Sequence, residues 1–170
     1  MSKNNLFVEK GYANFELEVI GQQQHSSIPP KQTVVGVLAR AVAQLEANPQ
    51  PSRFGTGVES DMFAYLAPHM SFAYRLVLAN LWLFNGLFVD LIGQSKTTDA
   101  LQRTTTAVTI MNSGFKVNVI PFKATAIVNH RVHPVDTLES VLQHDQDVID
   151  DWRYYVDWRK WQTNNCLLLK

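Results

Sequence analysis

The order of strand-like and helix-like hydrophobic patterns is the feature that most restricts the fold of this chain. Apolar residues alternate with glutamates over residues 15–19, which is the period of a half-buried strand, and Gly21 follows. Over residues 33–47 apolar residues recur every three or four positions, which is the period of a helix. Residues 104–111 are rich in β-branched side chains and residues 123–132 alternate, so both are predicted strands.

A longer helical stretch separates the first helix from the β-branched strand. Residues 58–100 carry helix-like periods in two or three pieces, with Pro68 and Gly86 as the expected breaks, and we interpret them as a helical insertion. The most apolar part, between Leu76 and Ile92, is interrupted by polar residues and falls short of the roughly 20 residues that span a bilayer. We therefore expect no transmembrane segment. A buried helix pair or an apolar surface packed on another domain is predicted, with contact to a membrane surface as the alternative.

The last third of the chain completes the pattern. Residues 112–114, Asn-Ser-Gly, favour a turn between the two predicted strands, and Asp136 followed by Glu139 has the spacing of a capping box at the start of a helix. An alternation over residues 154–158 predicts a last strand. The order strand, helix, helical insertion, strand, strand, helix, strand predicts an α+β fold. We expect an antiparallel sheet with helices on one face, in a single domain of residues 1–170.

The charge balance argues against a nucleic-acid partner. Fifteen lysines and arginines balance fifteen acidic residues, and the basic residues are scattered, so the basic patch of a nucleic-acid binder is missing. Cys166 is the only cysteine, which excludes an internal disulfide and a cysteine metal cluster. No long apolar segment follows Met1, so we expect a soluble chain without a signal peptide of its own. The compartment stays open.

His25 is the first candidate functional residue. It lies in residues 21–30, between the first strand pattern and the first helix pattern, and such turns carry function more often than packing. Ser26, Ser27 and Pro29 favour a short, stiff turn around the imidazole. Two interpretations are open. The residue is either a structural or surface histidine, or an electrophilic group whose N–H donates to an oxygen that gains negative charge in a transition state.

Arg131 and Asn118 are the second pair of candidates. A guanidinium is suited to bidentate capture of a carboxylate, and Asn118 could add a neutral donor to the same group. Asn129 is two residues from Arg131, so in a strand the two side chains share a face. The alternative is that Arg131 simply caps the surface of a strand. Together with His25, these residues predict a polar site for a carboxylate or a carbonyl.

Metal binding and nucleophilic catalysis find little support in the sequence. His130 and His133 are three residues apart and would point to opposite faces of a strand, with no carboxylate cluster beside them. The chain has no His-x-Asp, no adjacent Glu-Glu and no His-Glu-x-x-His, and neither Ser26 nor Ser27 lies in a Gly-x-Ser-x-Gly turn. We therefore predict no metal site in this chain.

Two residue clusters near the C-terminus give little indication of function. A mostly acidic, solvated helix face is predicted from His144, Asp145, Asp147, Asp150 and Asp151. A base-stacking platform is considered for Trp152, Trp158, Trp161, Tyr154 and Tyr155. The second interpretation is weak because no groove of basic residues surrounds the aromatic rings.

Six segments together carry a family resemblance. They are Gly21–Pro30, Gly36–Glu46, Asn80–Phe84, Arg103–Ile110, Lys116–Pro121 and Asn129–Pro134. Over residues 11–151 or so the chain resembles the dimerisation, or lid, domain of M20 family metallopeptidases. The segments Asn-Leu-Trp-Leu-Phe and Arg-Thr-Thr-Thr resemble the carboxypeptidase S and N-fatty-acyl-amino-acid synthase/hydrolase branch in particular.

The resemblance implies a ferredoxin-like lid that is inserted into a separate catalytic domain. In such enzymes that domain holds two zinc ions and a Glu general base, and the lid commonly forms a homodimer. His25 matches the lid histidine that polarises the scissile amide carbonyl, in dimeric members at the partner's catalytic centre. Arg131 and Asn118 match positions that hold the carboxylate of a small N-acyl amino acid or peptide substrate.

Departures from the family pattern suggest that the chain is part of an enzyme. The zinc-ligand motifs are missing from the sequence, so we expect no bound zinc and no hydrolysis by this chain alone. Residues 152–170 diverge from the family, as the tail of a truncated or frameshifted reading frame would, and Gln22–Gln24 replace its small residues before the histidine. The alternative is a stand-alone, non-catalytic dimerisation or interaction module. A small-ligand sensor rests on fold analogy alone.

Overall fold

One four-stranded antiparallel sheet organises the protein. The computed structural model describes residues 7–8, 10–56, 62, 65–149, 156–164 and 168–169. The strand order is β4–β6–β2–β7, with β2 at Gly11–Ile20, β4 at Thr105–Ser113, β6 at Lys123–Val132 and β7 at Val156–Asn164. Two short pairs flank the sheet, β1 (Phe7–Val8) with β8 (Leu168–Leu169) and β3 (Gln24–His25) with β5 (Val119–Ile120).

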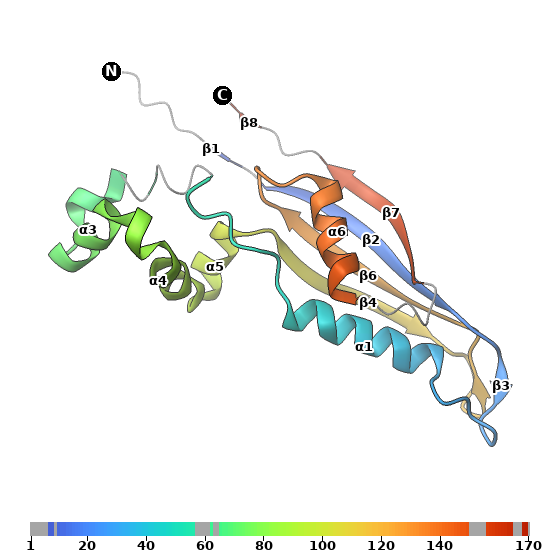
Figure 1. Ribbon diagram of the computed structural model, residues 1–170. Coiled ribbons are helices and arrows are strands. Elements are labelled where there is room, and N and C mark those ends of the chain that lie inside the picture. The colour runs from blue at the N-terminus through green and yellow to red at the C-terminus, as the bar shows by residue number, and fades with distance from the viewer. Residues whose placement is uncertain are drawn as a thin grey trace.

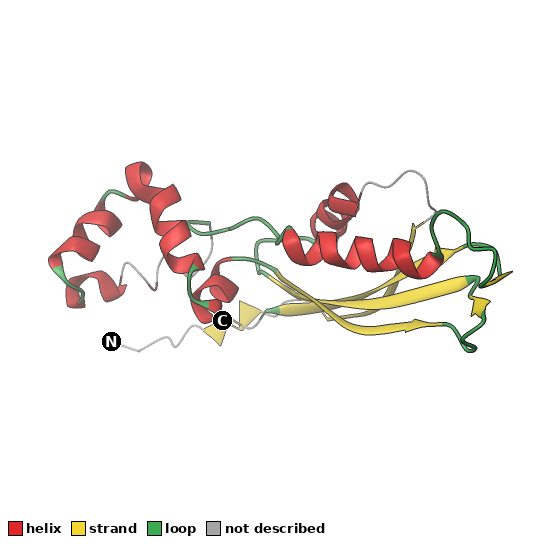
Figure 2. Cartoon of the chain, turned by 90° about the horizontal axis from the view of Figure 1, so that it is seen from below, coloured by secondary structure: helices red, strands yellow, loops and turns green. Residues whose placement is uncertain are grey.

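Two helices cover one face of this sheet. They are α1 (Val34–Ala47) and α6 (Leu138–Ile149), and Figure 1 and Figure 2 show both on the same side of the strands. The other face carries no helix within the described ranges. The predicted α+β fold, an antiparallel sheet with helices on one face, is therefore confirmed.

The pairing of β2 with β6 determines which side chains are buried. It runs without a shift from Gly11 opposite Val132 to Ile20 opposite Lys123. Since neighbouring side chains in a strand point to opposite faces, every second residue lies under the helices. The core beneath α1 and α6 contains Leu17, Val19, Val34, Val37, Leu38, Ala41, Leu45, Ala124, Ala126, Val128 and Ile149.

The first helix begins and ends where the sequence predicts. The N-cap is Thr33, whose Oγ1 accepts a hydrogen bond from the Gly36 N–H at 3.1 Å. At the other end the Asn48 N–H donates to the Gln44 carbonyl at 3.0 Å, and Pro49 follows. The buried side of α1 packs on the sheet, so the amphipathic pattern read from residues 33–47 is confirmed.

The described part of the predicted insertion contains a 3-10 turn and three helices of seven or more residues. They are η1 (Ala67–His69), α3 (Phe72–Ala79), α4 (Leu81–Gly93) and α5 (Lys96–Gln102). The predicted helix break at Gly86 is wrong, because Gly86 lies inside α4. The break between α3 and α4 falls at Asn80 instead. A helical glycine costs only about 1 kcal/mol relative to alanine, which is too little to interrupt a helix that buries Phe88 and Ile92. Within the described residues, the helices are all too short or too polar to cross a membrane.

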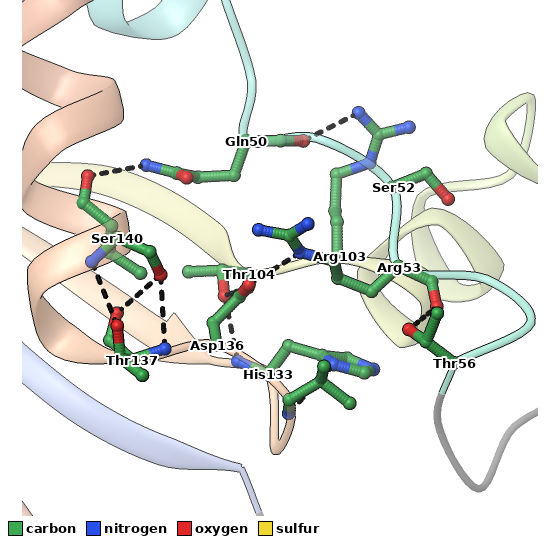
Figure 3. A network of polar contacts seen from close by, with 12 residues as sticks. Gln50, Ser52, Arg53, Thr56, Arg103, Thr104, His133, Asp136, Thr137 and Ser140 are labelled. Carbon is green, nitrogen blue, oxygen red and sulfur yellow. Dashed lines mark hydrogen bonds and ion pairs between the residues drawn. The ribbon is translucent and has the colours of Figure 1, made fainter.

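A polar network attaches the insertion to the sheet. We call residues 50–54 and 102–104, which flank it, the insertion stem. On one side of the stem Arg53 Nε donates to Asp136 Oδ1 at 2.6 Å, and on the other Thr104 Oγ1 donates to Asp136 Oδ2 at 2.5 Å, as Figure 3 shows. The Asp136 side chain is only 2% exposed. One buried carboxylate therefore binds both sides of the stem.

The role of Asp136 in the stem explains a wrong prediction about α6. The helix is capped one residue later than expected, by Thr137, whose Oγ1 accepts from the Ser140 N–H at 3.1 Å. In return, Ser140 Oγ accepts from the Thr137 N–H at 3.1 Å. The predicted Asp136–Glu139 capping box does not form, because the Asp136 carboxylate is already bound by Arg53 and Thr104.

The predicted solvated acidic face on α6 is wrong for Asp145. This residue is 1% exposed, and its Oδ2 lies 2.9 Å from Nε2 of His130, which is fully buried in β6. The two atoms are close without being aligned as a hydrogen bond. The other oxygen of Asp145 accepts from Gln50 Nε2 at 2.8 Å. Asp147 is exposed as predicted, and Asp150 and Asp151 lie outside the described residues.

Two smaller predictions near the sheet also have outcomes. Asn112 and Ser113 belong to β4, so the predicted turn starts later, at Gly114 with its positive φ of 76°. The predicted last strand exists as β7, whereas Trp152, Tyr154 and Tyr155 of the considered aromatic platform lie outside the described residues.

Replacing Gly21 should destabilise the junction between β2 and the loop before α1. An added Cβ would lie 2.7 Å from Cγ1 of Val34, a β-branched side chain with little freedom to move. We expect Gly21→Ala to lower the free energy of unfolding by about 1–3 kcal/mol, measured by urea denaturation.

Gly36→Ala is the matched control for that measurement. Its Cβ would meet only Thr33 Oγ1, at 3.5 Å, on the exposed side of α1. We expect it to raise the free energy of unfolding by up to about 1 kcal/mol, since alanine is the better helix former. Equal effects of the two substitutions would contradict the close approach of Gly21 to Val34.

Candidate functional site

His25 and Asn118 lie in adjacent turns at one end of the sheet. Strand β3 pairs with β5, so that His25 is opposite Val119. The Ser26 N–H donates to the Asn118 carbonyl at 3.1 Å, which holds the two turns together. Figure 1 shows this tip at the end of the molecule that is far from the insertion. Two candidates that are distant in sequence are thus neighbours in space.

The His25 imidazole is exposed and held by Ser27. The backbone N–H of Ser27 donates to Nδ1 at 3.2 Å, and Ser27 Oγ lies 2.7 Å from the same nitrogen. A backbone N–H can only donate, so Nδ1 is an acceptor and the neutral ring carries its hydrogen on Nε2. The Nε2–H, for which the described residues offer no acceptor, is the group that an electrophilic role requires.

Asn118 offers an amide that lacks part of its hydrogen bonding. Its side chain is half-buried, and Oδ1 accepts no hydrogen bond from the described part of the chain. A buried polar atom without a partner is costly, so a partner from elsewhere would be stabilising. Rotation about χ2 exchanges the oxygen and the NH2 group, so the position can present either an acceptor or a donor.

Arg131 lies near the other end of β6, on the face of the sheet without helices. Its guanidinium is exposed and stands 5.8 Å from the centre of the Tyr12 ring, a cation–π contact with the residue opposite it in β2. Asn129 is on the same face, as the two-residue spacing predicts, but its Nδ2 donates to Asn14 Oδ1 at 2.6 Å. The guanidinium keeps its planar donor edge for a carboxylate, whereas the Asn129 amide is already engaged.

The candidates therefore form two separate groups within one chain. The tip with His25 and Asn118 adjoins the Lys123 end of β6, and Arg131 is eight residues further along the same strand. At about 3.3 Å per residue, this is a separation of about 26 Å. A small substrate cannot touch both groups of a single copy.

One ion pair lies beside the tip. Lys123 Nζ lies 3.1 Å from Glu18 Oε1, and the Glu18 side chain is buried. Among the described residues, His25 has no such charged partner, and its exposed imidazole can meet a group from outside.

The two histidines of β6 and its following turn do not form a metal site. His130 faces Asp145 beneath α6, and His133 accepts a hydrogen bond at Nδ1 from the Val135 N–H at 3.4 Å. Among the described residues, no three His, Cys, Asp or Glu side chains gather closely enough to hold a metal ion.

The sequence did not reveal two of the contacts at these sites. The bond from Ser27 to the ring depends on the local turn, and the only signal is the spacing of two between His25 and Ser27. The ring of Tyr12 beneath Arg131 depends on strand register, which a single sequence does not display.

Comparison with known proteins places the chain in one family. The family model for a peptidase dimerisation domain of the M20 type matches residues 7–151. The chain is 46% identical over 145 residues to N-fatty-acyl-amino acid synthase/hydrolase PM20D1 of Xenopus tropicalis, covering 85% of this chain and 28% of that protein. It is 42% identical over 149 residues to a carboxypeptidase S-like protein of Dictyostelium discoideum, covering 87% of this chain and 28% of that protein.

Solved structures with low sequence identity share the fold. Human carnosine dipeptidase 1 superposes with a TM-score of 0.55 at 14% identity, over 98% of this chain and 41% of that one. An M20 family metallo-carboxypeptidase from Sulfolobus solfataricus gives 0.54 at 16% identity, over 91% of this chain and 38% of that one. The chain spans less than a third of the length of the relatives PM20D1 and carboxypeptidase S-like protein. By its family match over residues 7–151, the chain belongs to the M20 peptidase dimerisation domains.

Proposed function

We propose that this chain is the lid of a zinc-dependent hydrolase that acts on N-acyl amino acids or small peptides. The observation that carries the proposal is the 46% identity over 145 residues to an N-fatty-acyl-amino acid synthase/hydrolase, within a dimerisation domain family. The matched region is 28% of that relative, so the rest of such an enzyme would supply the catalytic domain. In this proposal the zinc ions are held by that second domain, as the family resemblance implies.

We assign a distinct task to each group of residues, and the geometry supports the assignment. At the tip, the Nε2–H of His25 donates to the carbonyl oxygen of the scissile amide, where negative charge grows during attack. The exposed guanidinium of Arg131 pairs with the substrate carboxylate through two parallel N–H donors. Asn118, bound to the His25 loop through its backbone, adds an amide to the tip.

The separation of these groups favours a dimer in which each site uses both copies. Because His25 and Arg131 of one chain are roughly 26 Å apart along the sheet, one substrate can meet both only if the tip comes from the partner. A two-fold dimer places the same pair of groups at each of two sites. The unpaired edge of β4 in the described sheet, with Ile110 and Met111 exposed, offers a surface for such an association.

A stand-alone, non-catalytic interaction module is the second candidate function. The same exposed β4 edge supports it, since an edge strand pairs readily with another chain. Sedimentation equilibrium of the 170-residue chain tests this reading. A monomer at all concentrations would count against both self-association and the module.

Removing the imidazole should slow hydrolysis by the enzyme that contains this lid. We expect His25→Ala to lower kcat by about 10²–10³, the usual loss for one oxyanion donor, when N-acyl amino acid hydrolysis is measured. Ser27→Ala should cost much less, about threefold to tenfold, because the Ser27 backbone N–H still binds Nδ1 and only the Oγ contact is lost.

Ser26→Ala serves as the control for these two variants. Ser26 binds the neighbouring turn through its backbone N–H, which alanine retains, so turnover should stay near the wild-type value. Wild-type kcat in the His25→Ala enzyme would rule out the electrophilic role.

Mixing two inactive variants should restore activity if each site combines two copies. In a dimer of one His25→Ala and one Arg131→Ala subunit, one site keeps both groups and the other loses both. Random reassociation should then recover about a quarter of the wild-type activity, measured after the subunits are unfolded together and refolded. No recovery, with heterodimers demonstrated by differential tags, would mean that both groups act within one chain.

A further inference from the structure

Arg131 is held in a different way from the two arginines of the insertion stem. Arg53 and Arg103 each bind an aspartate through their N–H groups, with N–O distances of 2.6 Å and 2.9 Å. Within the described ranges no acidic side chain pairs with Arg131, whose guanidinium instead stands over the Tyr12 ring, 5.8 Å from its centre. An aromatic face attracts a cation without using the hydrogen-bond donors of that cation. The contact therefore leaves the N–H groups of Arg131 available to a ligand.

Strand register places the Tyr12 ring beside Arg131. Tyr12 is directly opposite Arg131 in the unshifted β2–β6 ladder, and Thr105 of β4 is opposite Arg131 on the other side. The side chains of directly opposite residues share a face, with Cβ atoms about 5 Å apart. The threonine side chain is too short to reach the end of an arginine, whereas the tyrosine ring extends beneath the guanidinium. Of the two cross-strand neighbours, Tyr12 is thus the one that supports the charge.

The polar neighbours of Tyr12 along the chain are bonded elsewhere. Two residues further along β2, Asn14 Oδ1 accepts from Asn129 Nδ2 at 2.6 Å. Two residues before Tyr12, Lys10 Nζ donates to the Arg103 carbonyl at 2.6 Å. The Tyr12 side chain itself is half-buried, and a tyrosine has only two rotatable side-chain bonds. The ring is therefore a firmer support than a second long, flexible side chain would be.

A support of this kind matters because an arginine side chain is long. To bind both oxygens of a carboxylate, the guanidinium must present two parallel N–H donors to the same group. An unsupported arginine loses rotamer freedom when it adopts that geometry, and this loss weakens binding. A ring that restrains the guanidinium in advance reduces the loss. The Tyr12 contact restrains Arg131 and keeps its donors available at the same time.

We propose that Tyr12 is a positioning residue that orients Arg131 for the carboxylate of the substrate. The inference rests on the proposed function, because that function assigns the carboxylate to Arg131. Tyr12 contacts the guanidinium and not the reacting atoms, so its loss should weaken substrate binding more than it slows the chemical step. The aromatic face carries the contact, and phenylalanine should therefore replace tyrosine.

The first test measures the hydrolysis of N-decanoyl-leucine by the enzyme that contains this lid. We expect Tyr12→Leu to raise KM about threefold to tenfold and to change kcat less than twofold, because the aromatic support is lost while the guanidinium remains. Tyr12→Phe should keep both constants within about twofold of the wild-type values, since the ring is retained. Thr105→Val is the matched control on the other side of Arg131, and it should leave both constants unchanged.

A double-mutant cycle separates positioning from a general effect on the fold. If the ring acts through the guanidinium, Tyr12→Leu should have no further effect on the residual kcat/KM of the Arg131→Ala enzyme. An equal loss with and without Arg131 would mean that the ring supports only the fold, and would reject the proposal. An unchanged KM in Tyr12→Leu, with a raised KM in Arg131→Ala, would also reject it and would leave the proposed function standing.

The second test does not depend on hydrolysis. In the isotope-labelled 170-residue chain, the NMR signal of the Arg131 Nε–H is identified as the one that Arg131→Lys removes. A guanidinium over the face of a ring should have this proton shifted upfield by the ring current. Tyr12→Leu should return the signal to the position of exposed arginine side chains, and Tyr12→Phe should leave it in place. An unmoved signal in Tyr12→Leu would reject the positioning role.

The two tests together distinguish failure of this inference from failure of the proposed function. A ring-shifted signal that Tyr12→Leu abolishes, combined with wild-type kinetics in Arg131→Ala, would reject the assignment of the substrate carboxylate to Arg131. It would still support Tyr12 as the residue that orients the guanidinium.

Discussion

The unshifted pairing of β2 with β6 is the constraint on which the rest of the structure depends. Ten residues of β2 meet ten of β6, and the alternation of side chains then decides which of them face the helices and which face the open side. Leu17, Val19, Ala126 and Val128 lie under the helices, while Tyr12 and Arg131 meet on the open face. A slip of one residue would reverse both faces at once, burying the guanidinium and exposing the core. The ladder therefore defines the hydrophobic core and the candidate site together.

A polar region lies at each end of the same ladder, and different kinds of contact hold the two regions in place. At the Lys123 end, the His25 loop is held by β3–β5 pairing and by the backbone bond from Ser26 to Asn118. At the Val132 end, the insertion stem is held by a buried carboxylate, Asp136, which is shared between Arg53 and Thr104. Backbone hydrogen bonds at the tip tolerate most side chains, whereas removing one partner of the Asp136 network would leave a buried charge without compensation. The insertion is thus attached by residue-specific contacts, and the tip mainly by its backbone.

Local periodicity was enough to predict the regular elements, and long-range contacts account for what it missed. The helix after Thr33 and the strand at residues 123–132 were predictable because their patterns agree with both local preference and burial. Asp145 was predicted to be solvated, but the position of α6 over His130 buries it, and no local pattern encodes that packing. The capping box failed at Asp136 because a partner 83 residues earlier, Arg53, binds its carboxylate. His25, Asn118 and Arg131 stay predictions from residue type and family resemblance, whereas their division between two ends of the sheet needed the strand register.

A continuous sheet between the two groups of candidate residues has a consequence for how a lid of the proposed kind would move. The β2–β6 ladder is paired along its whole length and packed beneath α1 and α6, so we expect it to move as one body. If the His25 end of the ladder closes on a substrate, the Arg131 end must move as well. The size of that movement depends on its distance from the axis of rotation. In a two-fold dimer that shares its sites, closing the tip of one copy onto the partner's substrate would also reposition the Arg131 of the first copy. The two sites would then be mechanically coupled through the lid, and the length of the ladder, rather than any single contact between the sites, would set the strength of that coupling.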